Sequence, residues 1–194
     1  MMKKKNRKTG IVALTVIMIV FLSAALVLIS RILERRTYKL VYADEIQMYA
    51  GKYDLDPFLI AAVIHCESAN IPDAVSRSGA IGLMQVMPQT GEWIAEKLDM
   101  ENFSEHRLNE PAVNIEMGCW DLSFLYDRYD GNLTNMLAAY NAGHGNADKW
   151  LRDESLSQEG QLREIPFKET EDYVEKVLRA YDKYKALYPK ETLG

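Results

Sequence analysis

Two adjacent segments decide the fold of this chain: Pro57-Phe-Leu-Ile-Ala-Ala-Val-Ile-His-Cys-Glu67 and Ser76-Arg-Ser-Gly-Ala-Ile-Gly-Leu-Met-Gln-Val-Met-Pro88. The first is almost wholly apolar. It follows Asp56, a good N-cap residue, and has proline at its first position, so it predicts a buried helix. The second is rich in glycine and predicts a loop, with a small hairpin between Ala80 and Val86. Glu67 is therefore expected at the end of a buried helix, facing this loop.

Glu67 has the expected environment of a general acid. Burial disfavours the ionised form of a carboxyl group and raises its pKa. The partial negative charge at the C-terminal end of a helix acts in the same direction. A carboxylic acid that keeps its proton near neutral pH can protonate a leaving oxygen. The alternative is a glutamate that only ends a helix and faces water.

The rest of the domain predicts further helices and no long strands. Asn109 is expected to cap a long helix in which Val113, Met117, Trp120 and Phe124 form an inward face. In the last helix, Val174, Val177, Leu178, Tyr181 and Tyr184 mark the buried stripe. The other helices are expected near 43–52, 88–98, 132–140 and 146–151, and the last near 168–188. The fold class is therefore mainly α, with a small β or loop element.

The N-terminal region predicts a membrane anchor. Residues 10–30 carry no charge and are dominated by Ile, Val, Leu and Ala, and about 20 such residues span a bilayer as a helix. Basic residues flank this run and are slightly more frequent before it, which places the N-terminus inside. We therefore expect a cytoplasmic basic tail (1–10), a transmembrane helix (11–30), a stalk (31–42) and a domain (43–194) on the outer face of the cell membrane.

A cleavable signal peptide is the competing interpretation of this region. The apolar part of a signal peptide is usually about 7–15 residues long and ends at an A-x-A-like cleavage site. Here the run is longer and continues into Leu-Ile-Ser-Arg-Ile-Leu-Glu-Arg-Arg without a good site. The uncleaved single-pass anchor is favoured for this reason.

Charge is divided unevenly along the chain. Residues 37–194 carry a net charge of −12, because 15 basic residues oppose 27 acidic ones. This acidic balance argues against a nucleic-acid partner, which selects basic surfaces. It also argues against charge-driven docking on anionic wall polymers, and it fits a largely neutral substrate.

No cofactor or metal site is predicted. His65-Cys-Glu67 resembles the H-x-E element of zinc deaminases, but their second P-C-x-x-C element is absent from the sequence. The two cysteines, Cys66 and Cys119, lie in apolar helical segments, where a free cysteine packs as a small hydrophobic residue. Two buried thiols are favoured, and a single disulfide is the alternative.

Four sequence blocks resemble the catalytic domain of the soluble lytic transglycosylases and occur in that family's order. They are Glu67-Ser68, Gly79-Ala-Ile-Gly-Leu-Met-Gln-Val-Met-Pro88, Ala138-Ala-Tyr-Asn-Ala-Gly143 followed by Trp150, and Ile165-Pro-Phe-Lys-Glu-Thr170 with Tyr173-Val174. Each block alone is weak, but together they cover most of the outer domain. The resemblance implies a lysozyme-like fold.

The resemblance also implies cleavage of the β-1,4 bond between N-acetylmuramic acid and N-acetylglucosamine in peptidoglycan glycan strands. Glu67 would protonate the glycosidic oxygen and then, as a carboxylate, accept the proton of the muramyl C6 hydroxyl. Attack within one sugar gains from proximity and needs no second carboxylate. The product would be a 1,6-anhydromuramyl end, formed without water, so that the enzyme is formally a lyase.

Five further residues match substrate-binding positions of the family. Ser76 and Gln85 match polar contacts in the cleft, and Met87 matches an apolar contact beneath a sugar ring. Tyr140 matches a residue close to the acid. Glu169 matches a carboxylate that binds the saccharide or its peptide stem. Local structure offers other roles: Met87 in the core, Glu169 in the first turn of the last helix, and Ser76 in a turn.

Two other functions remain open. One is a hydrolytic muramidase of the goose-lysozyme kind, which would need a positioned water and usually a second carboxylate; Asp73 is the nearest acid in the sequence. The other is a wall-binding scaffold without activity, which the presence of Glu67 disfavours.

The chain departs from the family at Asn70, where an aromatic residue is common, and at Ile71-Pro72, where Asn-Pro is usual. These changes affect the cleft wall rather than the acid.

Overall fold

The computed structural model describes residues 2–189 and 192, with side chains from residue 14 onward, in two compact units, residues 1–39 and 40–194. The first unit is one helix, α1 (Met2–Thr37), which includes most of the expected stalk. The stretch Leu14–Thr37 is long and apolar enough to cross a membrane, as judged by its length and composition.

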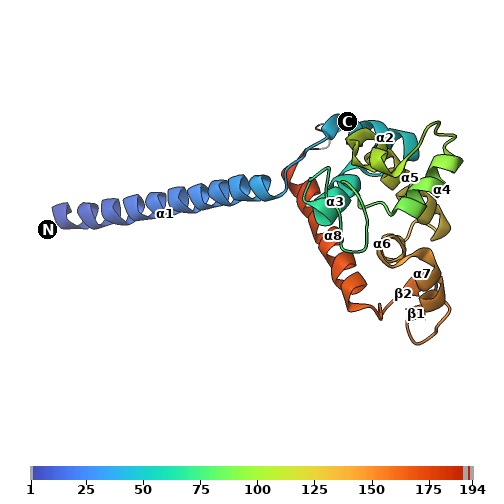
Figure 1. The fold of residues 1–194 in the computed structure, drawn as a ribbon. Helices are drawn as coiled ribbons and strands as arrows, with labels where there is room; N and C mark the ends of the chain where they lie inside the picture. Colours follow the sequence, from blue (N-terminus) through green and yellow to red (C-terminus); the bar gives the residue numbers. More distant parts are fainter. Residues whose placement is uncertain (1, 190–191, 193–194) are drawn as a thin grey trace. The chain divides into compact units, whose positions relative to one another are not determined.

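The second unit is built almost entirely of helices (Figure 1). They are α2 (Ala43–Tyr53), α3 (Pro57–Ser68), α4 (Pro88–Lys97), the 3-10 helix η1 (Glu105–Asn109), α5 (Pro111–Arg128), α6 (Leu133–Ala142), α7 (His144–Leu151) and α8 (Lys168–Leu187). Two-residue strands β1 (Ser157–Gln158) and β2 (Gln161–Leu162) pair antiparallel. The mainly α fold class is therefore confirmed.

Helix α3 is the centre of this unit. Its Asp56 side chain accepts a 2.9 Å hydrogen bond from the Phe58 backbone N–H, and Pro57 occupies its first turn. Residues from Phe58 to Ile64 are all buried, so every face of the helix contacts protein. Helix α8 packs along α3 (Figure 1), although the two are separated by a hundred residues of sequence.

Some sequence expectations were wrong in detail. Asn109 does not cap α5, because η1 occupies the preceding residues and Glu110 takes the N-cap position without a side-chain bond. Trp120 and Phe124 are only half-buried. Their rings stack on each other and meet Trp93 edge-on, at centroid distances of 5.0 and 5.4 Å. In α8, Leu178 and Tyr181 are half-buried rather than part of the core, and the Tyr181 hydroxyl bonds Asp56 at the surface.

Candidate functional site

Glu67 lies in the last turn of α3 and is half-buried. The helix ends at Ala69, whose backbone is left-handed with φ 51° and whose N–H bonds the His65 carbonyl. The neighbouring Ser68 is buried and donates a 2.9 Å hydrogen bond to the Leu83 carbonyl in the glycine-rich loop. The end of α3 is thereby fixed against that loop, as the sequence predicted.

The surroundings of Glu67 favour its protonated form. Burial raises its pKa to about 7 from an ordinary value of 4.5, while Tyr173 and Lys176 act in the opposite direction. The Tyr173 hydroxyl is buried without a hydrogen bond of standard geometry among the described residues, yet it interacts with the Glu67 carboxyl closely enough to lower its pKa. A carboxyl group that titrates near neutrality can both donate and accept a proton at physiological pH.

Tyr140 connects α6 to the glycine-rich loop beside this acid. Its hydroxyl donates a 2.7 Å hydrogen bond to the Met84 carbonyl. Burial, then the nearby charges of Glu67 and Asp121, raise the pKa of the Tyr140 hydroxyl well above its usual value. Tyr140 thus lies close to Glu67, where the sequence expected it.

The loop between α3 and α4 is organised by Asn114, which is fully buried in α5. Its side-chain amide donates to the carbonyls of Ile81 and Leu108, each at 2.8 Å, and its oxygen accepts from the Met84 N–H at 2.7 Å. Single β-bridges join Ile81 to Val75 and Val86. The expected hairpin is therefore reduced to these bridges, and Asn114 holds the rest of the loop.

Ser76 and Gln85 both belong to this loop and both bond within it. The Ser76 hydroxyl accepts from the Ala80 N–H and lies 2.9 Å from the Ser78 hydroxyl. The Gln85 amide nitrogen donates to the carbonyls of Ala74 and Gly82 at 3.1 and 2.9 Å, from a backbone with φ 50°. These bonds occupy the Gln85 amide nitrogen and leave its oxygen as the group that can meet a substrate.

Met87 and Glu169 lie at the surface. Met87 is 41% exposed at the N-cap of α4, so it is not a core residue. Glu169 is exposed in the first turn of α8, where a carboxylate is stabilised by the helix dipole. Both side chains are accessible to a substrate, and their assigned roles stay predictions.

Four residues that lie beside the acid, its loop or Tyr140 received no role from the sequence: Asn114, Asp121, Tyr173 and Lys176. Tyr173 belongs to a family block, and the other three carry no motif signal. Asp121 shares the inward face of α5 with Asn114 and Gly118, and burial raises the pKa of its carboxyl to about 7. It is thus a second strongly desolvated acid close to Tyr140.

Cys66 and Cys119 are both free thiols. Cys119 is buried as expected, whereas Cys66 is half-buried. Burial raises the pKa of the Cys66 thiol to about 11, so it stays protonated at neutral pH. Asp73, the nearest acid after Glu67 in the sequence, is exposed in the loop.

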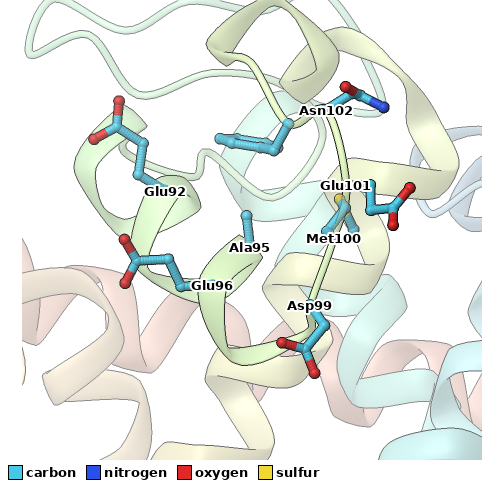
Figure 2. A pocket seen from close by; sticks show the side chains of 8 residues that line it. Glu92, Ala95, Glu96, Asp99, Met100, Glu101 and Asn102 are labelled. Atoms are coloured by element: carbon cyan, nitrogen blue, oxygen red, sulfur yellow. The ribbon is translucent and has the colours of Figure 1, made fainter.

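A separate surface depression lies beside α4. Figure 2 shows Glu92 and Glu96 of α4 together with Asp99 and Glu101 around it. None of the six sequence-predicted site residues lines it. Its acidic rim has no counterpart in the motifs, so the candidate site is the region around Glu67 and not this depression.

Known proteins are similar to this chain over most of its second unit. The family model described as the transglycosylase SLT domain matches residues 44–161. The soluble lytic murein transglycosylase of Escherichia coli is 34% identical over 155 residues, which are 78% of this chain and 24% of that protein. The membrane-bound lytic murein transglycosylase C of Actinobacillus pleuropneumoniae is 33% identical over 165 residues, covering 74% of this chain and 45% of the relative.

Solved structures show the same relationship. The 70 kDa soluble lytic transglycosylase of Escherichia coli superposes with a TM-score of 0.71 at 31% identity, over 82% of this chain and 26% of that one. An inactive glutamate-to-glutamine mutant of the lytic transglycosylase Slt of Pseudomonas aeruginosa gives a TM-score of 0.68 at 32% identity, over 77% and 25%. The chain spans about a quarter of the length of these soluble relatives. It nevertheless carries the matched domain over most of its own length, and it belongs to the transglycosylase SLT domain family.

Proposed function

We propose that this protein is a peptidoglycan lytic transglycosylase with Glu67 as its single catalytic residue. The observation that carries the proposal is the half-buried position of the Glu67 carboxyl at the end of α3, where burial raises its pKa to about 7. The family's sequence blocks meet near Glu67, because Ser68 bonds Leu83, Tyr140 bonds Met84, and both Tyr140 and Tyr173 interact with the Glu67 carboxyl.

The reaction has two proton transfers at one carboxyl group. Protonated Glu67 gives its proton to the glycosidic oxygen as the bond from that oxygen to the muramyl C1 breaks. The resulting carboxylate accepts the proton of the C6 hydroxyl of the same sugar while that oxygen bonds to C1. No water is consumed, and Glu67 ends in its starting state. A pKa near the working pH suits both transfers.

Ser76, Gln85, Met87, Tyr140 and Glu169 are the proposed substrate contacts. Met87 offers an exposed apolar surface for a sugar ring, and Gln85 offers its side-chain oxygen. Tyr140 acts at the acid itself and maintains the loop through Met84. The neutral glycan backbone is compatible with the acidic domain.

A hydrolytic muramidase is the second candidate, and Asp121 is the observation that favours it. This half-buried acid lies near Tyr140, on the face of α5 that also carries Asn114, and could serve as the second carboxyl group of a hydrolase. A hydrolase adds water to the new end, whereas a transglycosylase does not, so the products separate the two.

The test uses the full-length protein in detergent micelles and purified peptidoglycan. Mass spectrometry of the released muropeptides is expected to find ends that lack one water relative to hydrolysed ends. Glu67→Gln is expected to release none while still binding glycan, and Glu164→Gln, which changes an exposed glutamate outside the site, serves as the matched control. Normal cleavage by Glu67→Gln would remove Glu67 as the acid, and release of only hydrated ends would favour the muramidase.

We further propose that residues 11–30 anchor the protein in the cytoplasmic membrane as a single uncleaved span, with the N-terminus inside. The apolar stretch of α1 and the basic residues before it support this topology. The mass of the protein extracted from membranes tests cleavage, since loss of the first 30 residues would indicate a signal peptide. Alkaline phosphatase fused after residue 194 is expected to be active, because it would lie outside.

A further inference from the structure

Helix α8 supplies a cation to the last turn of the helix that carries Glu67. The Lys176 ammonium donates a 2.8 Å hydrogen bond to the backbone carbonyl of Cys66, the residue directly before Glu67. Lys176 lies three residues after Tyr173, so the two share one face of α8. That face packs against α3, which brings both side chains to the acid.

The bond supplies a hydrogen-bond donor that the C-terminal end of α3 lacks within the helix. The last carbonyl groups of a helix have no partner within the helix, and they carry partial negative charge. The Ala69 N–H satisfies the His65 carbonyl, and Lys176 satisfies the next one, at Cys66. An ammonium at this place both completes the helix end and ties it to α8.

We propose that Lys176 is a positioning residue for Glu67: it holds the end of α3 against α8 and keeps a positive charge beside the acid. The inference rests on the proposed function, because positioning matters only if Glu67 performs the chemistry. Lys176 itself remains exposed and bonds the backbone rather than the substrate site.

The Lys176 charge affects the proton equilibrium of Glu67, which must both donate and accept a proton. Burial alone would raise the Glu67 pKa further, and the ammonium opposes burial by favouring the carboxylate. Burial and, after it, the charge of Lys176 lower the pKa of His65, while at Cys66 the same charge opposes the rise in pKa that burial causes. The carboxylate form, which must accept the C6 proton, is therefore less costly to form than burial alone would allow.

The charged and titratable groups around the site come from helices α3, α5, α6 and α8. Helix α8 contributes Tyr173, Lys176 and Arg179, of which Arg179 opposes the rise that burial causes in the pKa of Cys66. The other groups are Tyr140 on α6, Asp121 on α5, and His65 and Cys66 on α3. Lys176 and Tyr173 are the two among them that lower the Glu67 pKa. The cation's effect is therefore distinguishable by replacing one residue.

Three substitutions separate the two parts of this role in the full-length protein. Lys176→Arg keeps both the charge and a donor for the Cys66 carbonyl, Lys176→Gln keeps a neutral donor, and Lys176→Met keeps neither. Lys185→Met is the matched control, because it removes the same charge from an exposed position of α8. The Lys185 ammonium lies over the ring of Tyr181. Thermal unfolding of each variant checks that the fold is retained.

The readouts are the pH profile of kcat/KM on purified peptidoglycan and the Glu67 titration itself. The latter is followed by the 13C signal of its carboxyl carbon, which is assigned as the signal lost in Glu67→Gln. In Lys176→Met and Lys176→Gln the Glu67 pKa and the basic limb of the profile are expected to rise by about half a pH unit. In Lys176→Met, kcat is expected to fall about tenfold with little change in KM, because the acid is held less rigidly.

Lys176→Arg and Lys185→Met are expected to behave as the wild type. The inference is overturned if the Glu67 titration of the Met and Gln variants coincides with that of the wild type, or if Lys185→Met shifts it equally. If the wild type releases no anhydromuramyl ends, the proposed function fails instead. The 13C titration then still decides the electrostatic part of the inference, since it requires no activity.

Discussion

The Tyr140 hydroxyl donates a 2.7 Å hydrogen bond to the Met84 carbonyl, and this bond joins α6 to the loop that faces Glu67. Tyr140→Phe removes the hydroxyl and leaves the carbonyl without this donor. We expect a loss of about 1–3 kcal/mol in the free energy of unfolding and a fall in kcat. Thermal unfolding and peptidoglycan digestion measure the two effects, and a variant with normal stability and normal kcat would contradict the role of this bond.

Asn114 is expected to be among the most sensitive structural positions. Asn114→Ala leaves the Met84 N–H and the carbonyls of Ile81 and Leu108 without their side-chain partner in a buried place. The expected destabilisation is about 3 kcal/mol or more, with loss of activity because the loop is released. Asn109→Ala, which removes one surface bond to the His106 carbonyl, is the control and is expected to stay within about 0.5 kcal/mol of the wild type.

Substitutions at two glycines of the same loop distinguish the cost of backbone strain from the cost of steric crowding. Gly79 and Gly82 both have positive φ, 90° and 81°, but a Cβ at Gly79 would meet open space. A Cβ at Gly82 would collide with the Asn114 side chain and the Leu108 carbonyl. Gly79→Ala is expected to cost about 1 kcal/mol, and Gly82→Ala considerably more, with loss of activity. Equal unfolding temperatures for the two variants would contradict the close approach at Gly82.

Asp121 is expected to make stability depend on pH. Folding raises its pKa from 3.8 to about 7, so the folded protein holds this proton more tightly than the unfolded chain. The resulting stability is fully present below about pH 4 and is lost as pH rises through about 7. Asp121→Asn lacks this titration, and above pH 8 it is expected to be more stable than the wild type by about 2–4 kcal/mol.

The measurement is thermal unfolding of both proteins between pH 4 and pH 9. Asp153→Asn is a control of opposite sign, because hydrogen bonds from Ser155 lower the pKa of that exposed carboxyl. It is expected to show no gain at high pH. A constant difference between Asp121→Asn and the wild type across the range would show that Asp121 is not perturbed by folding.

The parts of the fold with local signals were predictable from the sequence. Helix α3 was expected from 57 to about 67 and extends from Pro57 to Ser68, since Asp56 and Pro57 mark its start by their own chemistry. The start of α5 was mispredicted because η1 and α5 meet with one residue between them, and Asn109 belongs to the first of the two. Whether Trp120 faces the core depends on its partner Trp93, which lies on another helix.

The position of Glu67 could be predicted, but its surroundings could not. Tyr173 and Lys176 reach it from α8, more than a hundred residues away, and spacing along the chain contains no information on that approach. Asn114 sits within a helix, where an amide is ordinarily a surface residue. Its function follows only from the buried loop carbonyls that it meets.

The origin of the oxygen at newly formed glycan ends tests the central claim most directly. The full-length protein digests purified peptidoglycan in 18O-labelled water, and the new muramyl ends are weighed by mass spectrometry. The account predicts ends that lack one water and contain no solvent oxygen, and no products from Glu67→Gln. New ends that carry 18O from the solvent at the moment of cleavage would contradict it and indicate a hydrolase.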